Sequence, residues 1–170
     1  AVHSASIAHP DDQVAQALNT AMNAALSDYP LLAGNHIELL LNGDEAYPAM
    51  LDANRQARHH IHLQSFIIRA DVTGREFLDL LVEKARNGVK VRVLYDRFGS
   101  TYGVLSGFFR RYRRIPNLSL VGWTQANPVK RQFQINLRNH RKVLVVDGRK
   151  AFTGGINIAD NNRASLTEEP

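Results

Sequence analysis

Residues 60–95, HIHLQSFIIRADVTGREFLDLLVEKARNGVKVRVLY, decide the fold class. Residues 60–68 predict a strand, Thr73 precedes a predicted helix, and Gly88 stands where the C-terminal glycine of that helix belongs. Residues 89–95 predict a second strand. The helix has an apolar stripe made of Phe77, Leu78, Leu81, Val82 and Ala85. A strand, a helix and a strand of these lengths are typical of a βαβ crossover, so we predict an α/β fold with a mixed, largely parallel β-sheet flanked by helices.

Further elements are predicted on both sides of this unit. Upstream, the sequence predicts a helix over residues 11–28, a strand over 36–41 and a helix over 45–58. Downstream, it predicts a helix over 103–114, a short strand over 118–121 and a buried strand over 143–146. The 170 residues, 44% of them hydrophobic, suffice for one core. We therefore expect a single domain over residues 1–170, with residues 1–30 as an N-terminal helical extension.

The composition restricts the chemistry. The chain has no cysteine, which excludes disulfides, a thiolate nucleophile and a cysteine-based zinc site. It has no apolar run of about 18 residues, so we expect no transmembrane segment. Residues 1–85 carry 5 Lys and Arg against 11 Asp and Glu (net −6), whereas residues 86–170 carry 16 against 5 (net +11). The basic half suits a phosphate-bearing partner, either nucleic acid or an acidic lipid surface, although charge alone is equally typical of a solvated basic surface.

Residues 139–147, NHRKVLVVD, and residues 154–157, GGIN, carry the chemistry. Together they fit the pattern His-x-Lys-x4-Asp-x6-Gly-Gly-x-Asn. With roughly 5% usage for each residue type, six fixed positions coincide by chance on the order of once in 10⁸ starting points. The pattern is therefore a functional motif and not an accident of composition.

His140 and Lys142 are two residues apart on an extended segment, so their side chains project to one face and can meet one phosphate. Lys142 and Asn157 would stabilise the charge on the phosphoryl oxygens, while His140 would attack phosphorus or protonate the leaving oxygen. Asp147 has the opposite parity, so an unbroken strand would point its carboxylate away from that face. We therefore expect His140, Lys142 and Asn157 to be catalytic, with Asp147 in a supporting role.

Four further residues are expected to contact the substrate. Gly154 and Gly155 have no Cβ and let a backbone approach closely, while Arg138 and Arg141 flank His140 with positive charge. We expect no metal and no other cofactor, since Lys142 supplies the charge that a metal would otherwise provide.

This motif resembles the one that defines the phospholipase D superfamily. Four more stretches resemble the N-terminal half of bacterial cardiolipin synthases: residues 34–40 (GNHIELL), 44–51 (DEAYPAML), 94–100 (LYDRFGS) and 136–142 (NLRNHRK). The resemblance implies a phospholipase D-type half with one catalytic motif, as a fragment of a two-motif protein. It also implies a bacterial source and a peripheral location at the cytoplasmic membrane.

The resemblance further implies an enzyme, a phosphatidyltransferase that works in two steps without metal. One histidine takes up the phosphatidyl group as a phosphohistidine, and the histidine of a second motif acts as acid and then as base. The donor would be an anionic phospholipid, and the acceptor a hydroxyl of phosphatidylglycerol. Because the second half would come in cis or from a homodimer, the isolated chain is expected to be inactive. In such enzymes a carboxylate orients the histidine, here Glu168, Glu169 or a residue beyond Pro170.

Two other functions stay open at this point. One is a superfamily nuclease or phosphodiesterase that works as a homodimer, with nucleic acid as its partner. The other is a module that binds anionic phosphate groups without turnover. Covalent labelling separates them from the transferase, because a binding module forms no phosphohistidine.

Two weaker patterns have competing interpretations. A metal site is conceivable at His59, His60 and His62, although no carboxylate or cysteine lies beside them in the sequence to complete it. Residues 108–114 interleave aromatic side chains with arginines. This segment could rest on an anionic bilayer, or it could pack its rings inward and leave the arginines solvated.

Overall fold

The computed structural model describes residues 10–26, 34–124 and 139–163. The chain divides into two units, Ala1–Leu39 and Leu40–Pro170. In the first unit, helix α1 (Pro10–Leu26) forms where the sequence predicts a helix. Its stripe of large apolar side chains, Val14, Leu18 and Met22, is exposed.

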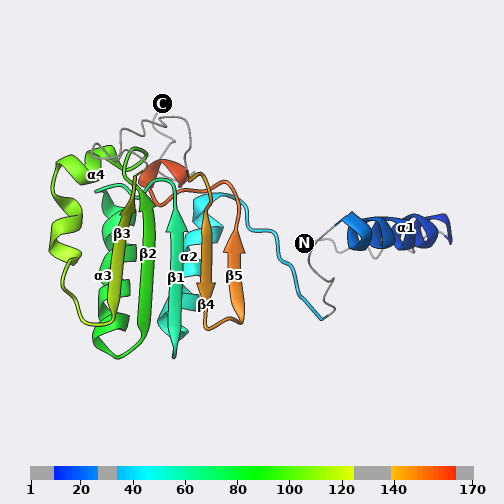
Figure 1. Ribbon diagram of the computed structural model, residues 1–170, viewed down its shortest axis with the longest axis horizontal. Coiled ribbons are helices and arrows are strands. Elements are labelled where there is room, and N and C mark those ends of the chain that lie inside the picture. The colour runs from blue at the N-terminus through cyan, green and yellow to red at the C-terminus, as the bar shows by residue number, and fades with distance from the viewer. Residues whose placement is uncertain (1–9, 27–33, 125–138, 164–170) are drawn as a thin grey trace. The chain divides into compact units, whose positions relative to one another are not determined.

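A five-stranded sheet forms the centre of the second unit, in the order β3-β2-β1-β4-β5 (Figure 1). Its strands are β1 (His60–Ser65), β2 (Lys90–Asp96), β3 (Leu118–Trp123), β4 (Val143–Val146) and β5 (Lys150–Thr153). β2 is parallel to both β1 and β3, while β4 runs antiparallel to β1 and to β5. The predicted βαβ crossover and the mixed α/β class are confirmed. In this topology the ends of β1, β2 and β3 meet the beginning of β4 at one edge of the sheet.

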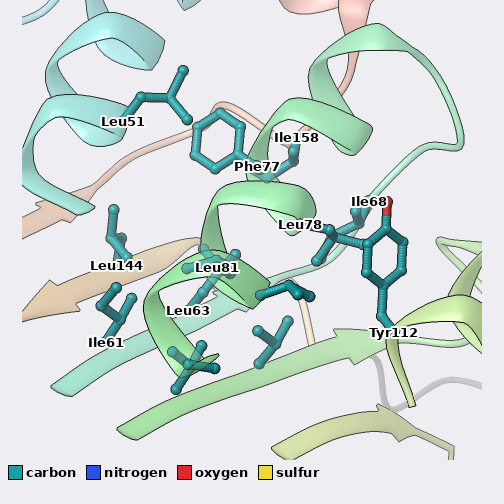
Figure 2. Packing of buried hydrophobic residues seen from close by; sticks show 14 of the residues in the cluster. Leu51, Ile61, Leu63, Ile68, Phe77, Leu78, Leu81, Tyr112, Leu144 and Ile158 are labelled. Atoms are coloured by element: carbon teal, nitrogen blue, oxygen red, sulfur yellow. The ribbon is translucent and has the colours of Figure 1, made fainter. Parts of the chain in front are cut away.

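Helices α2 (Asn42–Gln56) and α3 (Val72–Arg86) pack against each other and against the same face of the sheet (Figure 1). Alternate strand residues such as Ile61 and Leu63 are buried on this face. Figure 2 shows Leu51 of α2 and Phe77 of α3 in the same cluster of buried side chains. Burying each side chain of this size stabilises the fold by about 1.5–3 kcal/mol, so this layer holds the sheet edge in place.

The ends of α3 follow local sequence rules, with one correction. The helix begins at Val72 and so includes Thr73, which was predicted to precede it. Its N-cap is Asp71, whose carboxylate accepts a hydrogen bond from the Gly74 N–H at 2.9 Å. Gly88 lies just beyond the helix with a φ of +92°, as predicted for a helix C-terminal glycine.

The helix predicted over residues 103–114 is divided. It consists of α4 (Thr101–Leu105) and the 3-10 helix η1 (Phe108–Tyr112), because Gly107 between them has a φ of +74° and interrupts the helical path. The rings of Phe108, Phe109 and Tyr112 are all buried. The interpretation that these rings rest on a bilayer is therefore wrong, and they pack inward.

Three strands differ from the prediction. No strand forms over residues 36–41, where Ile37 and Leu39 are exposed, because alternating apolar residues form a strand only beside a partner strand. Strand β1 ends at Ser65, and Ile68 makes only an isolated bridge with Ile158. Strand β5 was not predicted at all, since four residues with little burial carry almost no pattern.

Candidate active site

His140 and Lys142 lie at the sheet edge where β1 ends and β4 begins. Val143, the first residue of β4, pairs with Gln64 near the end of β1. This register brings the segment before β4 beside Phe66, the first residue after β1.

The ring of His140 stacks on the ring of Phe66, with 3.9 Å between the centroids and 23° between the planes. The Lys142 ammonium lies 5.5 Å from the centroid of the same Phe66 ring and donates to the His140 carbonyl oxygen at 2.9 Å. His140 is exposed and Lys142 half-buried. An imidazole and an ammonium group therefore share one aromatic platform, within reach of a single phosphate. Sequence reasoning missed Phe66, because this residue lies inside the strand predicted over residues 60–68 and no local pattern set it apart.

Asp96 at the end of β2 supports the segment that carries His140. One oxygen of this buried carboxylate accepts hydrogen bonds from the N–H groups of Phe98 and Gly99, both at 2.9 Å. The other oxygen accepts from the Asn139 N–H at 3.4 Å. Asp96 thus connects the residue before His140 to the turn after β2, a role that no local pattern had indicated.

That turn packs closely against the Phe66 platform. A Cβ at Gly99 would lie 2.5 Å from the Phe66 carbonyl oxygen, so only glycine fits there. The Ser100 hydroxyl next to it is buried and accepts a hydrogen bond from the Ile68 N–H at 3.0 Å. Ser100 is therefore part of a structural loop.

Asn157 is held from two sides at the same sheet edge. Its side-chain oxygen accepts a hydrogen bond from the Ile67 N–H at 3.2 Å, and its carbonyl oxygen accepts one from the Tyr47 hydroxyl at 2.6 Å. Ile67 directly follows Phe66 in the sequence. Because the amide oxygen bonds to the protein, the NH2 group is the part of the Asn157 amide that can donate to a phosphate.

The chain after Asn157 is fastened to the beginning of α3. The Asp160 carboxylate accepts from the Thr73 N–H at 2.8 Å, and the Asp160 N–H donates to the Asp71 carboxylate at 2.8 Å. Burial raises the pKa of the Asp160 carboxyl, but the hydrogen bonds from Thr73 and Val72 and the positive charge of Arg163 together outweigh this and lower it. Arg163 donates to the Thr73 hydroxyl at 2.9 Å. These contacts fix the backbone that presents Asn157.

Asp147 lies at the other end of β4 from His140 and Lys142. The premise of an unbroken strand is wrong, because Asp147 has a φ of +53° and ends the strand. The four residues of β4 span about 13 Å, which places the carboxylate away from a phosphate at His140. Asp147 instead accepts hydrogen bonds from the N–H groups of Arg58, His59 and His60, each at 2.8 Å. Burial raises the pKa of Asp147, but these three donors hold it at about 2.

The expected substrate-binding residues are only partly described. Gly154 and Gly155 are exposed, and a Cβ at either would meet no heavy atom of the protein within 4 Å. The chain's own packing therefore does not demand glycine at these positions. Arg141 is exposed beside His140. Arg138 lies outside the described residues, as do the two candidate orienting carboxylates, Glu168 and Glu169.

The histidine cluster lies on the sheet face opposite α2 and α3. The rings of His60 and His62 are 4.9 Å apart, and the Arg92 guanidinium lies 3.0 Å from His62 Nε2. Burial lowers the pKa of His62, and the nearby His60 and Arg92 lower it further. Across residues 10–26, 34–124 and 139–163, no three His, Cys, Asp or Glu side chains are placed to hold a metal ion. Within the same ranges, no helix has both the length and the apolar character needed to cross a membrane.

Comparison with known proteins gives a consistent family. The family model described as "Cardiolipin synthase, PLD-like domain" matches residues 50–169. Cardiolipin synthase A of Pseudomonas syringae pv. syringae (strain B728a) is 43% identical over 135 residues, which are 79% of this chain and 28% of that protein. The cardiolipin synthase of Geobacillus thermodenitrificans (strain NG80-2) is 38% identical over 138 residues, 79% of this chain and 26% of that protein. The chain thus spans about a quarter of the length of these relatives.

Among solved structures, the phosphatidylserine synthase of Haemophilus influenzae Rd KW20 shares the fold. It superposes with a TM-score of 0.62 at 20% sequence identity, over 84% of this chain and 33% of that chain. This likeness concerns the fold alone.

Proposed function

The chain belongs to the cardiolipin synthase family of phospholipase D-like domains, and from this premise we propose that it supplies one half of a phosphatidyltransferase active site. The observation that carries the proposal is the placement of His140 and Lys142 over the Phe66 ring, at the same sheet edge as Asn157. Residues 1–170 would then form one phospholipase D-type half of a two-motif protein, with residues 1–30 as an extension.

The reaction is a double displacement at phosphorus. In the first step a histidine nitrogen attacks the phosphorus of a phospholipid, and a P–N bond forms as the bond to the alcohol oxygen breaks. A second histidine gives its proton to the leaving oxygen. In the second step this histidine removes the proton from an acceptor hydroxyl, whose oxygen attacks phosphorus and breaks the P–N bond. His140 fills one of the two roles, and the histidine of the second half fills the other.

The remaining motif residues have different tasks in this proposal. The Lys142 ammonium and the Asn157 amide N–H stabilise the negative charge that grows on the phosphoryl oxygens in each step. Gly154, Gly155, Arg138 and Arg141 bind the substrate headgroup. Asp147 supports the reaction only by holding the backbone of residues 58–60.

The names of the relatives support a phospholipid substrate. Two of them are cardiolipin synthases, and the net charge of +11 over residues 86–170 suits an anionic headgroup. The proposed donor is therefore an anionic phospholipid such as phosphatidylglycerol, and the proposed acceptor is a second phosphatidylglycerol hydroxyl. The proposed location is the surface of a bacterial cytoplasmic membrane. The second half is supplied in cis or by another copy of the chain.

Replacement of His140 by alanine in protein assembled with a second motif-bearing half tests the proposal. Transfer of a labelled phosphatidyl group to phosphatidylglycerol should fall by at least about 10²-fold, because an acid–base or nucleophilic group is lost. Circular dichroism should be unchanged, since His140 is exposed. His36→Ala, at another exposed histidine, is the matched control and should keep full transfer.

Three results would overturn this proposal. The first is a His140→Ala protein that keeps more than a few per cent of the transfer. The second is cleavage of DNA in place of lipid transfer, which would assign a nuclease. The third is binding of anionic phosphate groups with no phosphohistidine trapped on either half during turnover, which would assign a non-catalytic module.

A further inference from the structure

A pocket of about 130 Å³ lies between the end of β2, α4 and η1. Three of its lining residues are arginines: Arg97, Arg110 and Arg113. The others are Tyr95, Val104, Gly107 and Phe109, so none of the lining residues carries a carboxylate. Three positive charges that converge on a small pocket without a lining acid favour an anionic ligand.

Two of these arginines, Arg97 and Arg113, lie near the hydroxyl group of Tyr95, which also lines the pocket. Burial raises the pKa of the Tyr95 hydroxyl, and the positive charges of Arg97 and Arg113 partly oppose this effect. Gly122 permits the close packing, since a Cβ there would lie 2.8 Å from both the Arg97 Cγ and the Tyr95 hydroxyl oxygen. The pocket thus combines guanidinium donors with a phenolic hydroxyl, a set that can bind phosphate oxygens.

An exposed apolar stripe runs beside the pocket. Phe98, Tyr102 and Leu105 are 66%, 74% and 81% exposed, at positions i, i+4 and i+7 of a segment with successive helical turns. Phe98 directly follows Arg97, and Leu105 directly follows Val104, so two stripe residues are chain neighbours of pocket-lining residues. An arginine-rich pocket next to exposed aromatic and leucine side chains is the arrangement that suits a lipid headgroup and its acyl chains together.

We propose that this pocket and stripe form a docking site for an anionic phospholipid at a bilayer surface. The lipid phosphate occupies the pocket formed by Arg97, Arg110 and Arg113, while Phe98, Tyr102 and Leu105 enter the interface between headgroups and acyl chains. The site is separate from His140 and does not rest on the proposed reaction. Both lie where β1, β2 and β3 end, so docking at α4 would present lipid headgroups to the edge that carries His140 (Figure 1).

Soluble phosphate compounds share the headgroup chemistry but leave the stripe unused. Exposed large apolar side chains would not change the affinity of a site for free phosphate. They do add affinity for a bilayer, because Phe98, Tyr102 and Leu105 leave water on insertion. The proposal therefore commits to the lipid.

Binding of the 170-residue chain to sedimented vesicles tests the proposal. Vesicles of phosphatidylcholine containing phosphatidylglycerol should bind the chain, and vesicles of phosphatidylcholine alone should bind it much more weakly. Arg97→Gln and Arg110→Gln should each weaken binding about fivefold, the usual effect of one basic residue at an anionic surface. Leu105→Ser should weaken it roughly tenfold through lost apolar burial. Since every variant keeps α1, differences between variants report on the second unit.

Arg149→Gln is the matched control, because it removes the same charge from an exposed residue in the turn between β4 and β5. It should change binding by less than about twofold. Arg110→Lys keeps the charge and should retain binding, with circular dichroism verifying the fold of each variant.

The proposal is overturned if Arg97→Gln and Arg110→Gln behave like Arg149→Gln, since binding would then follow net charge alone. Equal binding to both vesicle types would overturn it too. So would Leu105→Ser binding to the vesicles as tightly as the wild type, because a site for free phosphate would leave the apolar stripe unused.

Discussion

Asparagine in place of Asp147 keeps the shape of the side chain but removes the negative charge that three backbone N–H groups share. In the folded chain those donors hold the pKa of Asp147 at about 2, against an ordinary value of 3.8. A difference of nearly two pH units corresponds to roughly 2.5 kcal/mol. Because the carboxylate is only partly buried, solvent screening reduces this to about 1–2 kcal/mol. Asp147→Asn should lower the free energy of unfolding at pH 7 by that amount.

The sign of the pH dependence follows from the lowered pKa. The Asp147 contribution is present above pH 3.8, where the unfolded carboxyl is also ionised, and it disappears as the pH falls to about 2. The wild-type chain should therefore lose stability over this window, and its advantage over Asp147→Asn should shrink toward zero. The other carboxyl groups titrate in both proteins, so their contributions cancel in the difference in unfolding free energy between the wild type and Asp147→Asn.

Urea unfolding followed by far-UV circular dichroism, at pH 7 and at several values down to about 2, measures the effect. Asp52→Asn is the matched control, since Asp52 is exposed and accepts a side-chain hydrogen bond from Gln56. It should change stability by less than about 0.5 kcal/mol. The reasoning is refuted if Asp147→Asn is as stable as this control at pH 7, or if its difference from the wild type does not change with pH.

Two further predictions concern the active site. Transfer activity of the assembled protein should survive dialysis against EDTA, because Lys142 and Asn157 provide the charge stabilisation. Loss of transfer activity with EDTA and its recovery with zinc or magnesium would contradict this metal-free mechanism. Gly154→Ala should change the free energy of unfolding by less than about 0.5 kcal/mol relative to the wild type, because the new Cβ meets no protein atom within 4 Å. The same substitution should lower transfer activity, because the added methyl group crowds the substrate or the second half. Unchanged transfer activity would mean that neither the substrate nor the second half approaches Gly154.

The elements that sequence could predict are those with a complete local signal. The crossover over residues 60–95 has two apolar strands and a helix with a regular stripe, and residues 143–146 form an apolar run. Each of these elements formed, although β1 ends three residues earlier than predicted. Residues 36–41 have a similar alternation but no neighbouring strand. β5, in contrast, takes its structure from pairing with β4 and not from its own residues.

In the candidate site, too, local spacing could be predicted from the sequence, whereas contacts between distant residues could not. His140 and Lys142 could be paired from their spacing alone. Their platform, Phe66, directly follows β1 and lies 74 positions before His140 in the sequence. The Tyr47 hydroxyl that donates to the Asn157 carbonyl oxygen lies 110 positions before Asn157. Such contacts depend on the register of β1 with β4 and on the packing of α2, which no local pattern contains. The supporting role of Asp147 is a prediction from strand parity, whereas the structure shows that Asp147 ends β4 and accepts hydrogen bonds from three N–H donors.

The half-site claim is tested most directly by assaying phosphatidyl transfer in fractions whose mass is measured by light scattering. An in-line displacement at phosphorus needs one histidine to attack while another protonates the leaving oxygen, and His140 cannot do both at once. A strictly monomeric fraction of this chain should therefore show no transfer, and activity should appear when a second motif-bearing half is added or when the chain dimerises. Full transfer activity in the monomeric fraction would contradict the account.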